Sequence, residues 1–233
     1  MPVAATTPIP ADALPPELGL PLVETFHSLQ GEGIHAGRSA FFLRLAGCDV
    51  GCSWCDTKVS WPAAAHPLRS LADLATETRE AAEAGAAFAV ITGGEPLQHD
   101  LTPLCTALRT ATAPCPRGPL PLHLETSGVH PLSGRFDWIT LSPKRHRPPR
   151  AELLTACHEL KVVVHEPTDL TFAVTMAEAA RSRPAAGSSA PEPALLLQPG
   201  WSSERGQELA VAFVRRHPDW RLSLQSHKWL GVR

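Results

Sequence analysis

Three cysteines lie within one short segment of the chain. Cys48, Cys52 and Cys55 follow the spacing C-x3-C-x2-C, and a short loop can turn all three sulfurs towards one metal centre. A zinc site normally has a fourth cysteine or histidine at a companion spacing, and an iron–sulfur cube is usually held by four thiolates. The other cysteines stand far downstream without a companion motif, at Cys105, Cys115 and Cys157. Three thiolates therefore indicate a cube with one iron left for a ligand that is not protein.

S-adenosylmethionine fits that open iron, because its amino and carboxylate groups can chelate it. Two plainer interpretations stay open, a zinc site with a distant ligand and three buried structural thiols. A second motif, Thr92-Gly93-Gly94-Glu95-Pro96, supports the first interpretation. Its glycines let backbone groups approach a ligand closely, and the carboxylate of Glu95 can pair with an ammonium group.

The elements that must position these groups alternate along the chain between short apolar runs and longer helical ones. Strands are expected at 40–45, 87–91, 120–124, 138–141, 160–164, 194–197 and 221–224, and helices at 68–84, 101–110, 170–181 and 203–216. Strands that are apolar throughout and alternate with helices predict a parallel sheet covered by helices. A full eight-fold barrel usually needs about 250 residues. The fold class expected here is therefore α/β, a partial (open) TIM-like barrel.

Polar, glycine-containing clusters follow five of the expected strands, at 47–55, 92–96, 125–128, 142–144 and 198–200. Active sites of parallel α/β folds lie at the carboxyl ends of their strands. Each cluster alone fits an ordinary Gly/Pro turn. Together they predict a ring of site loops.

Composition limits the class of protein. With 233 residues and 43% hydrophobic residues, we expect a flexible Pro/Ala-rich leader at 1–20 and one domain at 21–233 that includes an exposed loop at 181–193. A net charge of −2 and a pI near 6.6 argue against a nucleic-acid partner. No apolar run of roughly 18 residues predicts a membrane span, and no signal peptide is recognised at the start. We therefore expect a cytoplasmic protein.

The cysteine motif, with Trp54 before its last cysteine, resembles the signature of the radical S-adenosylmethionine superfamily. Further segments resemble one of its members, the 7-carboxy-7-deazaguanine synthase family; they lie at 24–33, 37–38, 42–48, 55–57, 125–128, 142–144 and 225–228. The resemblance extends in order from about Leu22 to Arg233. It implies a radical S-adenosylmethionine core within the open barrel.

The resemblance implies a [4Fe-4S] cluster on Cys48, Cys52 and Cys55, whose electron splits bound S-adenosylmethionine into methionine and a 5′-deoxyadenosyl radical. That family is a lyase that converts 6-carboxy-5,6,7,8-tetrahydropterin to 7-carboxy-7-deazaguanine with release of ammonia, in the biosynthesis of queuosine and other 7-deazapurines. The radical takes a hydrogen from C6 of the pterin, and the ring then contracts. Since the radical forms on the cofactor, no side chain is expected to be catalytic.

The resemblance also implies binding roles for individual residues of this chain. The resemblance assigns Mg²⁺ to Thr57. It assigns S-adenosylmethionine to Gly94, Glu95, Ser142, Pro143, Lys144 and Gln198, and the substrate to Leu29, Gln30, Gly31, Arg44, Thr92, His227 and the carboxylate of Arg233. A guanidinium such as that of Arg44 grips a planar carboxylate through two parallel hydrogen bonds, although an ordinary salt bridge is the plainer interpretation. Mg²⁺ keeps several waters and needs few protein ligands. The alternative for the Thr57 hydroxyl is a cap on the next turn.

The resemblance also implies a homodimer, and the chemistry requires an external electron donor, flavodoxin-like or ferredoxin-like. Two rival functions stay open. An activase that places a glycyl radical on a partner protein would share the cysteines and the GGEP motif, but would not need Arg44, Thr57 and His227. A metal-binding or electron-transfer module would have a closed centre that does not cleave S-adenosylmethionine.

Overall fold

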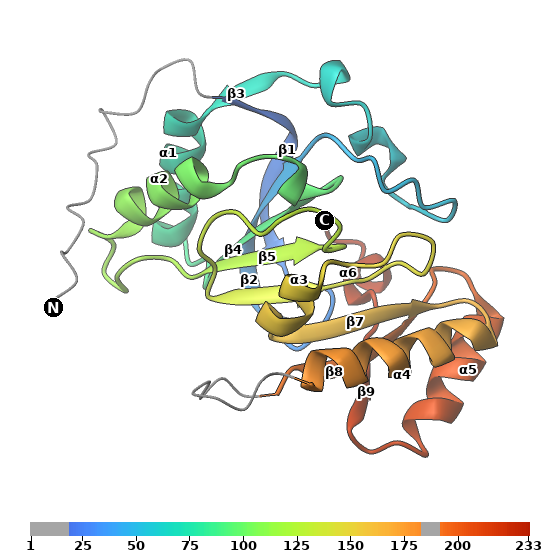
Figure 1. The fold of residues 1–233 in the computed structure, drawn as a ribbon. Coiled ribbons are helices and arrows are strands. Elements are labelled where there is room, and N and C mark those ends of the chain that lie inside the picture. Colours follow the sequence, from blue (N-terminus) through green and yellow to red (C-terminus); the bar gives the residue numbers. More distant parts are fainter. Residues whose placement is uncertain (1–18, 183–191) are drawn as a thin grey trace, which may run out of the picture.

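The computed structural model describes residues 19–182 and 192–233. In this part of the chain, nine strands form one sheet in the order β3-β1-β2-β4-β5-β6-β7-β8-β9 (Figure 1). Their bounds are β1 Gly19–Leu29, β2 Ser39–Leu45, β3 Leu68–Ser70, β4 Ala89–Gly93, β5 Leu122–Thr126, β6 Trp138–Leu141, β7 Glu159–Val164, β8 Ala194–Pro199 and β9 Trp220–Leu222. Strands β2 and β4 to β9 all run parallel. The sheet has two free edges, β3 and β9, so the expected open barrel of parallel strands is confirmed.

Two strands were not expected from the sequence. β1 pairs antiparallel with β2, and β3 pairs antiparallel with β1. Few residues of β1 are buried, so it lacks the apolar run that marks the central strands. Gly19 and Leu20, which the sequence placed in the leader, begin β1. The remainder of the expected leader, 1–18, lies outside the described residues.

Helices cover the sheet at the bounds α1 Leu71–Glu83, α2 Thr102–Thr112, α3 Ala151–Ala156, α4 Pro167–Arg181, α5 Glu204–Val214 and α6 Ser226–Leu230. The helix expected at 68–84 begins only at Leu71, because the Ser70 hydroxyl caps the Asp73 amide while residues 68–70 pair with β1. Arg181 ends α4 and does not begin the expected loop, most of which (183–191) lies outside the described residues. α3 and α6 were not expected. Figure 1 shows α1 and α2 beside β1 to β4, and α4 and α5 at the opposite side of the molecule.

The two faces of the parallel strands differ in chemistry. Because side chains alternate along a strand, one face of each strand packs on the helices and is fully buried, for example Leu43, Leu124 and Leu197. The other face lines the barrel interior. There Arg44 of β2 pairs in register with Thr92 of β4, so these polar side chains are neighbours. The expectation of strands that are apolar throughout is therefore wrong for the inner face of β2 and β4.

A loop at residues 30–38 and the amino ends of the strands close one end of the barrel. The ring of His35 lies 4.8 Å from that of His123 and 4.5 Å from that of Trp138, and Phe88 stacks on His123 at 4.0 Å. Residue Gln30 holds the loop closed through backbone hydrogen bonds to Gly37 and Arg38. Among the described residues, these rings and this loop therefore fill the end of the barrel at which the parallel strands begin.

Among the residues described, no helix combines the length and apolar character needed to cross a bilayer.

Candidate active site

A cavity of about 370 Å³ opens inside the barrel, and every residue predicted to bind the substrate lines it: Leu29, Gln30, Gly31, Arg44, Thr92, His227 and Arg233. These residues come from β1 and the loop after it, from β2 and β4, and from the C-terminal segment. The structure therefore brings together positions that are some 200 residues apart in the sequence. The cavity also contains four charged residues to which the sequence assigned no role: Glu32, Asp56, Glu125 and Lys228.

Arg44 is held by a neighbouring carboxylate. Its Nε donates to Glu24 Oε1 at 3.0 Å, and the other oxygen of Glu24 pairs with Arg233 Nη2 at 2.6 Å. Both guanidinium carbons lie within 6 Å of the Phe26 ring centroid, at 5.8 Å for Arg44 and 5.7 Å for Arg233. The salt bridge considered as the plainer interpretation thus exists, yet it leaves the terminal nitrogens of Arg44 for a ligand in the cavity.

Glu125 of β5 organises the inner wall of the cavity. Gln30 Nε2 donates to Glu125 Oε1 at 3.0 Å, and Thr92 Oγ1 donates to Glu125 Oε2 at 3.0 Å. Two of the predicted substrate residues therefore meet at one carboxylate. The signal available in the sequence was the polar residue at an inward position of a strand whose alternate residues are leucine.

Gly31 and His227 lie in close contact. A Cβ built on Gly31 would lie only 2.0 Å from His227 Nδ1, so only glycine fits at this position. The carbonyl of Gly31 accepts hydrogen bonds from the amide and the hydroxyl of Ser226, at 2.9 and 3.0 Å. Burial lowers the pKa of His227, which favours the neutral imidazole against the cavity.

A second cavity, of about 180 Å³, adjoins the first and is lined by Cys48, Cys52 and Cys55. All three cysteines are free thiols, and burial raises the pKa of Cys48 and Cys52. Within 19–182 and 192–233, no three His, Cys, Asp or Glu side chains converge on a point that one ion could fill. A cube that offers a separate iron to each sulfur spreads its ligands wider than a single zinc ion does. The donor set fits an iron–sulfur cluster with three protein ligands.

Thr57 lies beside the cysteine loop and faces the larger cavity. It is the N-cap residue of a short 3-10 helix (Lys58–Ser60), but its side chain makes no capping hydrogen bond. Its hydroxyl donates instead to Asp56 Oδ1 at 3.0 Å. The capping role considered from the sequence is not seen, and the Thr57 hydroxyl and Asp56 carboxylate together present oxygen donors of the kind that Mg²⁺ prefers.

The GGEP loop packs directly on the cysteine loop. A Cβ on Gly94 would lie 2.3 Å from the Gly47 carbonyl oxygen and 2.9 Å from Cys48 Cβ, so a side chain here would push the two loops apart. The Glu95 carboxylate accepts from Leu97 N and Thr126 Oγ1 on one oxygen, and from Ser127 N and Oγ on the other. These four donors use the lone-pair sites of a carboxylate. Glu95 therefore ties the loop after β4 to the loop after β5, and its pairing with a cofactor ammonium stays a prediction.

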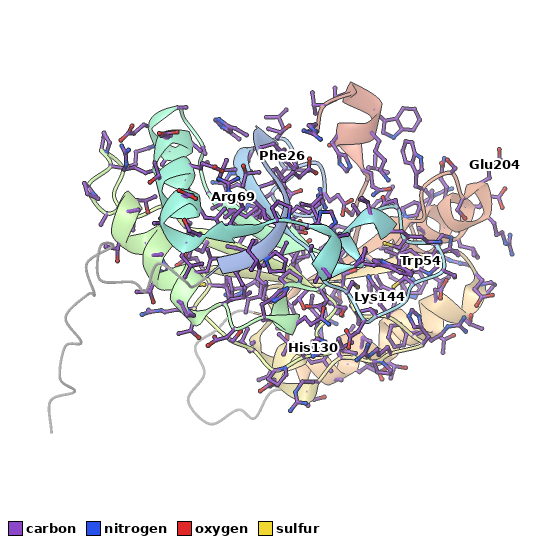
Figure 2. The ribbon with its side chains drawn as sticks, turned by 90° about the horizontal axis from the view of Figure 1, so that it is seen from above. Phe26, Trp54, Arg69, His130, Lys144 and Glu204 are labelled. Atoms are coloured by element: carbon purple, nitrogen blue, oxygen red, sulfur yellow. The ribbon has the colours of Figure 1, made fainter. Side chains whose placement is uncertain are left out.

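The other residues predicted to bind S-adenosylmethionine surround the second cavity or the cavities that adjoin it. Ser142 accepts a hydrogen bond from Lys144 Nζ at 2.8 Å, and Figure 2 shows Lys144 beside Trp54, with Nζ 5.1 Å from the ring centroid. Pro143 lines an adjoining hollow of about 90 Å³, and Gln198 lines one of about 400 Å³ that also contains Lys144. Burial lowers the pKa of Lys144.

The sequence analysis also missed a buried ion pair between the two cavities. Lys161 Nζ of β7 pairs with Glu32 Oε2, and the side chains are only 6% and 17% exposed. Burial alone would raise the pKa of Glu32, but the charge and the hydrogen bond of Lys161 lower it to about 2. Burial alone would lower the pKa of Lys161, but the carboxylates of Glu32, Glu125 and Glu159 raise it above its usual value. Both groups are therefore charged at neutral pH.

Comparison with known proteins finds close relatives. The chain is 52% identical over 220 residues to 7-carboxy-7-deazaguanine synthase from Prochlorococcus marinus, covering 91% of this chain and 98% of the relative. It is 47% identical to the Synechocystis enzyme, covering 91% and 93%, and 33% identical to the Escherichia coli enzyme, covering 91% and 98%. The chain belongs to the 7-carboxy-7-deazaguanine synthase family. No family model matches it.

A solved structure agrees with this membership. The chain superposes on the crystal structure of QueE from Escherichia coli with a TM-score of 0.72 at 29% identity, covering 91% of this chain and 96% of that one. The similarity therefore extends over most of both chains. The resemblance inferred from the motifs is confirmed.

Proposed function

We propose that the chain is a radical S-adenosylmethionine lyase that converts 6-carboxy-5,6,7,8-tetrahydropterin to 7-carboxy-7-deazaguanine with release of ammonia, a step towards queuosine and other 7-deazapurines. One observation carries the proposal. The cavity lined by the predicted substrate residues and the cavity lined by the three cysteines adjoin each other and share Asp56 and Glu125. A substrate in the first would lie next to a cofactor in the second.

The chain's own residues bind and orient the two ligands. The terminal nitrogens of Arg44 hold the substrate carboxylate, since Glu24 occupies its Nε. Glu125, Gln30 and Thr92 supply donors and acceptors for the polar edge of the pterin. His227 and Arg233 complete the cavity from the C-terminal side.

Three groups from outside the chain complete the site. Cys48, Cys52 and Cys55 would hold the [4Fe-4S] cluster, and Gly94, Ser142, Pro143, Lys144 and Gln198 surround the space for S-adenosylmethionine. When bound, these two groups supply the one-electron chemistry that removes a hydrogen atom from the substrate. Thr57 would hold Mg²⁺, with the substrate carboxylate completing its shell.

The proposal includes the setting of the enzyme. A small acidic electron carrier, flavodoxin-like or ferredoxin-like, reduces the cluster, and the enzyme works in the cytoplasm as a homodimer. Exposed apolar side chains support the dimer: Trp229 is 78% and Leu230 63% exposed on α6, and such residues favour association. Size-exclusion chromatography with light scattering measures the mass directly. A protein that stays at 25 kDa at micromolar concentration contradicts the dimer.

Turnover by the anaerobically reconstituted protein tests the function. With the pterin, S-adenosylmethionine, a low-potential reductant and Mg²⁺, we expect 7-carboxy-7-deazaguanine, ammonia and 5′-deoxyadenosine by mass analysis. Omitting Mg²⁺ lowers the rate if Thr57 holds the ion. Cys52→Ala should lose both the cluster absorbance and all three products. Cys115→Ala is the matched control, because Cys115 is a buried thiol away from both cavities, and it should keep them.

Two results would contradict the proposal. Cleavage of S-adenosylmethionine without pterin conversion, together with a radical on a partner protein, would favour the activase. A reconstituted centre that binds no S-adenosylmethionine would favour the closed metal-binding module.

A further inference from the structure

We propose that a C-terminal strap, residues 225–228, makes the binding of S-adenosylmethionine and the binding of the pterin mutually favourable. The proposal rests on the proposed function, because it takes the two cavities as the sites of these two ligands. It names Lys228 and Gln225 as positioning residues for the reaction. The strap comprises the N-cap residue Gln225 and the first residues of α6.

One side of the strap is fixed to the loop that forms the inner end of the substrate cavity. Ser226 N and Oγ both donate to the carbonyl of Gly31, and the ring of His227 occupies the space that a Cβ on Gly31 would need. Gln225 Nε2 donates to Glu32 Oε1 at 2.8 Å. The strap is therefore attached to the 30–32 segment by three hydrogen bonds and a tight contact.

The other side is fixed to the cysteine loop. Lys228 Nζ pairs with Asp56 Oδ2 at 2.5 Å, and Asp56 stands between the predicted cluster ligand Cys55 and the predicted Mg²⁺ ligand Thr57. Asp56 lines both the substrate cavity and the cysteine cavity. A movement of the strap would therefore also move Asp56, which lies in the segment that both ligands contact.

A third segment also meets Lys228. Its Nζ lies 4.7 Å from the centroid of the Trp201 ring, in the loop after β8 that follows the predicted cofactor residue Gln198. Its second hydrogen bond, to Gln225 Oε1 at 3.1 Å, lies within the strap. A single cation therefore joins the cysteine loop, the loop after β8 and the C-terminal helix, and its side chain is only 20% exposed.

This arrangement has a thermodynamic consequence. Each ligand orders segments that the strap connects. The conformational entropy lost when the first ligand binds is therefore not lost again when the second one binds. Coupling of this kind is reciprocal and commonly changes affinity by about 5- to 150-fold. Removing the Lys228 ammonium removes the ion pair with Asp56 and leaves a long hydrogen bond, from Gln225 Nε2 to Asp56 Oδ2 at 3.5 Å, between the strap and the cysteine loop. The hydrogen bonds of Ser226 to Gly31 stay in place.

Binding measurements on the reconstituted holoenzyme, without reductant so that nothing turns over, test the strap. We expect the wild type to bind S-adenosylmethionine at least fivefold more tightly when the pterin is saturating. In Lys228→Met this ratio should fall to about one, whereas Lys228→Arg should retain part of it, because a guanidinium can still pair with Asp56. Lys58→Met is the matched control and should keep the wild-type ratio; Lys58 is an exposed lysine of the neighbouring 3-10 helix that stacks on Trp61.

Hydrogen exchange on the same holoenzyme adds a structural readout. In the wild type, pterin should slow amide exchange both in the peptide containing Ser226 and in the one containing Trp201, which does not line the substrate cavity and meets the strap through Lys228. In Lys228→Met it should slow only the former. A Lys228→Met protein that keeps the full affinity ratio and the protection at Trp201 would overturn the strap alone. A wild type that binds neither ligand would instead overturn the proposed function, and the coupling with it.

Discussion

Ionisable side chains have different surroundings at the two ends of the barrel interior, although the same strands carry them. On β5, Glu125 faces the site cavity, and His123, two residues earlier, packs in the aromatic cluster. On β7, Lys161 faces the site and Glu159 lies nearer the closed end. At the site end Lys161 has an opposite charge as its partner, the Glu32 carboxylate. At the closed end the two histidines are surrounded by rings, and Glu159 accepts a hydrogen bond from the Ile34 amide.

The pKa values follow from that difference. The ion pair with Lys161 keeps Glu32 charged down to a pKa of about 2. Burial lowers the pKa of His123 to about 3 and lowers that of His35 as well, so both rings are neutral at pH 7. Burial likewise raises the pKa of Glu159. An inward position on a strand is thus not a functional signal in itself; a charge that is retained in the interior, next to a cavity, is one.

Removing the buried charge of Lys161 at the site end should have the largest effect on stability and turnover. Lys161→Met leaves Glu32 buried without its partner, and such a loss typically costs about 3–5 kcal/mol of stability. We expect a lower free energy of unfolding in urea and a loss of turnover of at least a hundredfold.

The double variant Lys161→Met/Glu32→Gln separates the two effects. It removes both charges, so stability should largely return, while turnover should stay low because both groups border the ligand cavities. If turnover returned together with stability, the pair would be a packing element like the rings at the closed end, and the contrast between the two ends would fail.

Arg44→Lys should have the next largest effect. A lysine keeps the charge but cannot offer two parallel donors to a carboxylate, so KM for the pterin should rise about tenfold or more, with the unfolding transition unchanged. The control is a pterin without its carboxylate, which should bind wild type and variant with equal affinity. A variant whose KM equals that of the wild type would show that Arg44 serves only its salt bridge with Glu24.

Glu24→Gln should act more weakly and only through Arg44. The amide oxygen can still accept from Arg44 Nε, but the charge that Glu24 shares with Arg44 and Arg233 is lost. We expect KM to change a few-fold while kcat stays the same, since Glu24 does not line the cavity. A fall in kcat at constant KM would contradict a positioning role.

The same contrast explains which parts of the fold and the site could be predicted from the sequence. The strands that form the parallel core were predictable because they contain runs of apolar residues, as in Leu195 to Leu197. The cysteine and GGEP motifs, being local, indicated the cofactor pocket. Glu32 and Lys161 were missed because their partnership spans 129 residues, and nothing in local spacing reports which distant charges meet. β1 was missed because its pairing with β2 and β3, and not an apolar run, makes it a strand.

Substituting His123 at the closed end should have the smallest effect on catalysis. It should, however, change how the free energy of unfolding depends on pH. His123→Phe keeps an aromatic ring stacked on Phe88, so turnover at pH 7.5 should be within about twofold of wild type.

His123 has a pKa of about 3 in the folded protein and 6.5 as its reference value. As the pH falls below 6.5, the unfolded chain takes up a proton that the folded chain does not, so wild-type stability falls. At about 1.4 kcal/mol per pH unit, the variant should gain about 2 kcal/mol relative to wild type between pH 7 and pH 5, measured by urea unfolding at constant ionic strength. Parallel curves over that range would show that His123 is charged in the folded protein, and the two ends of the barrel would then not differ in the way the structure indicates.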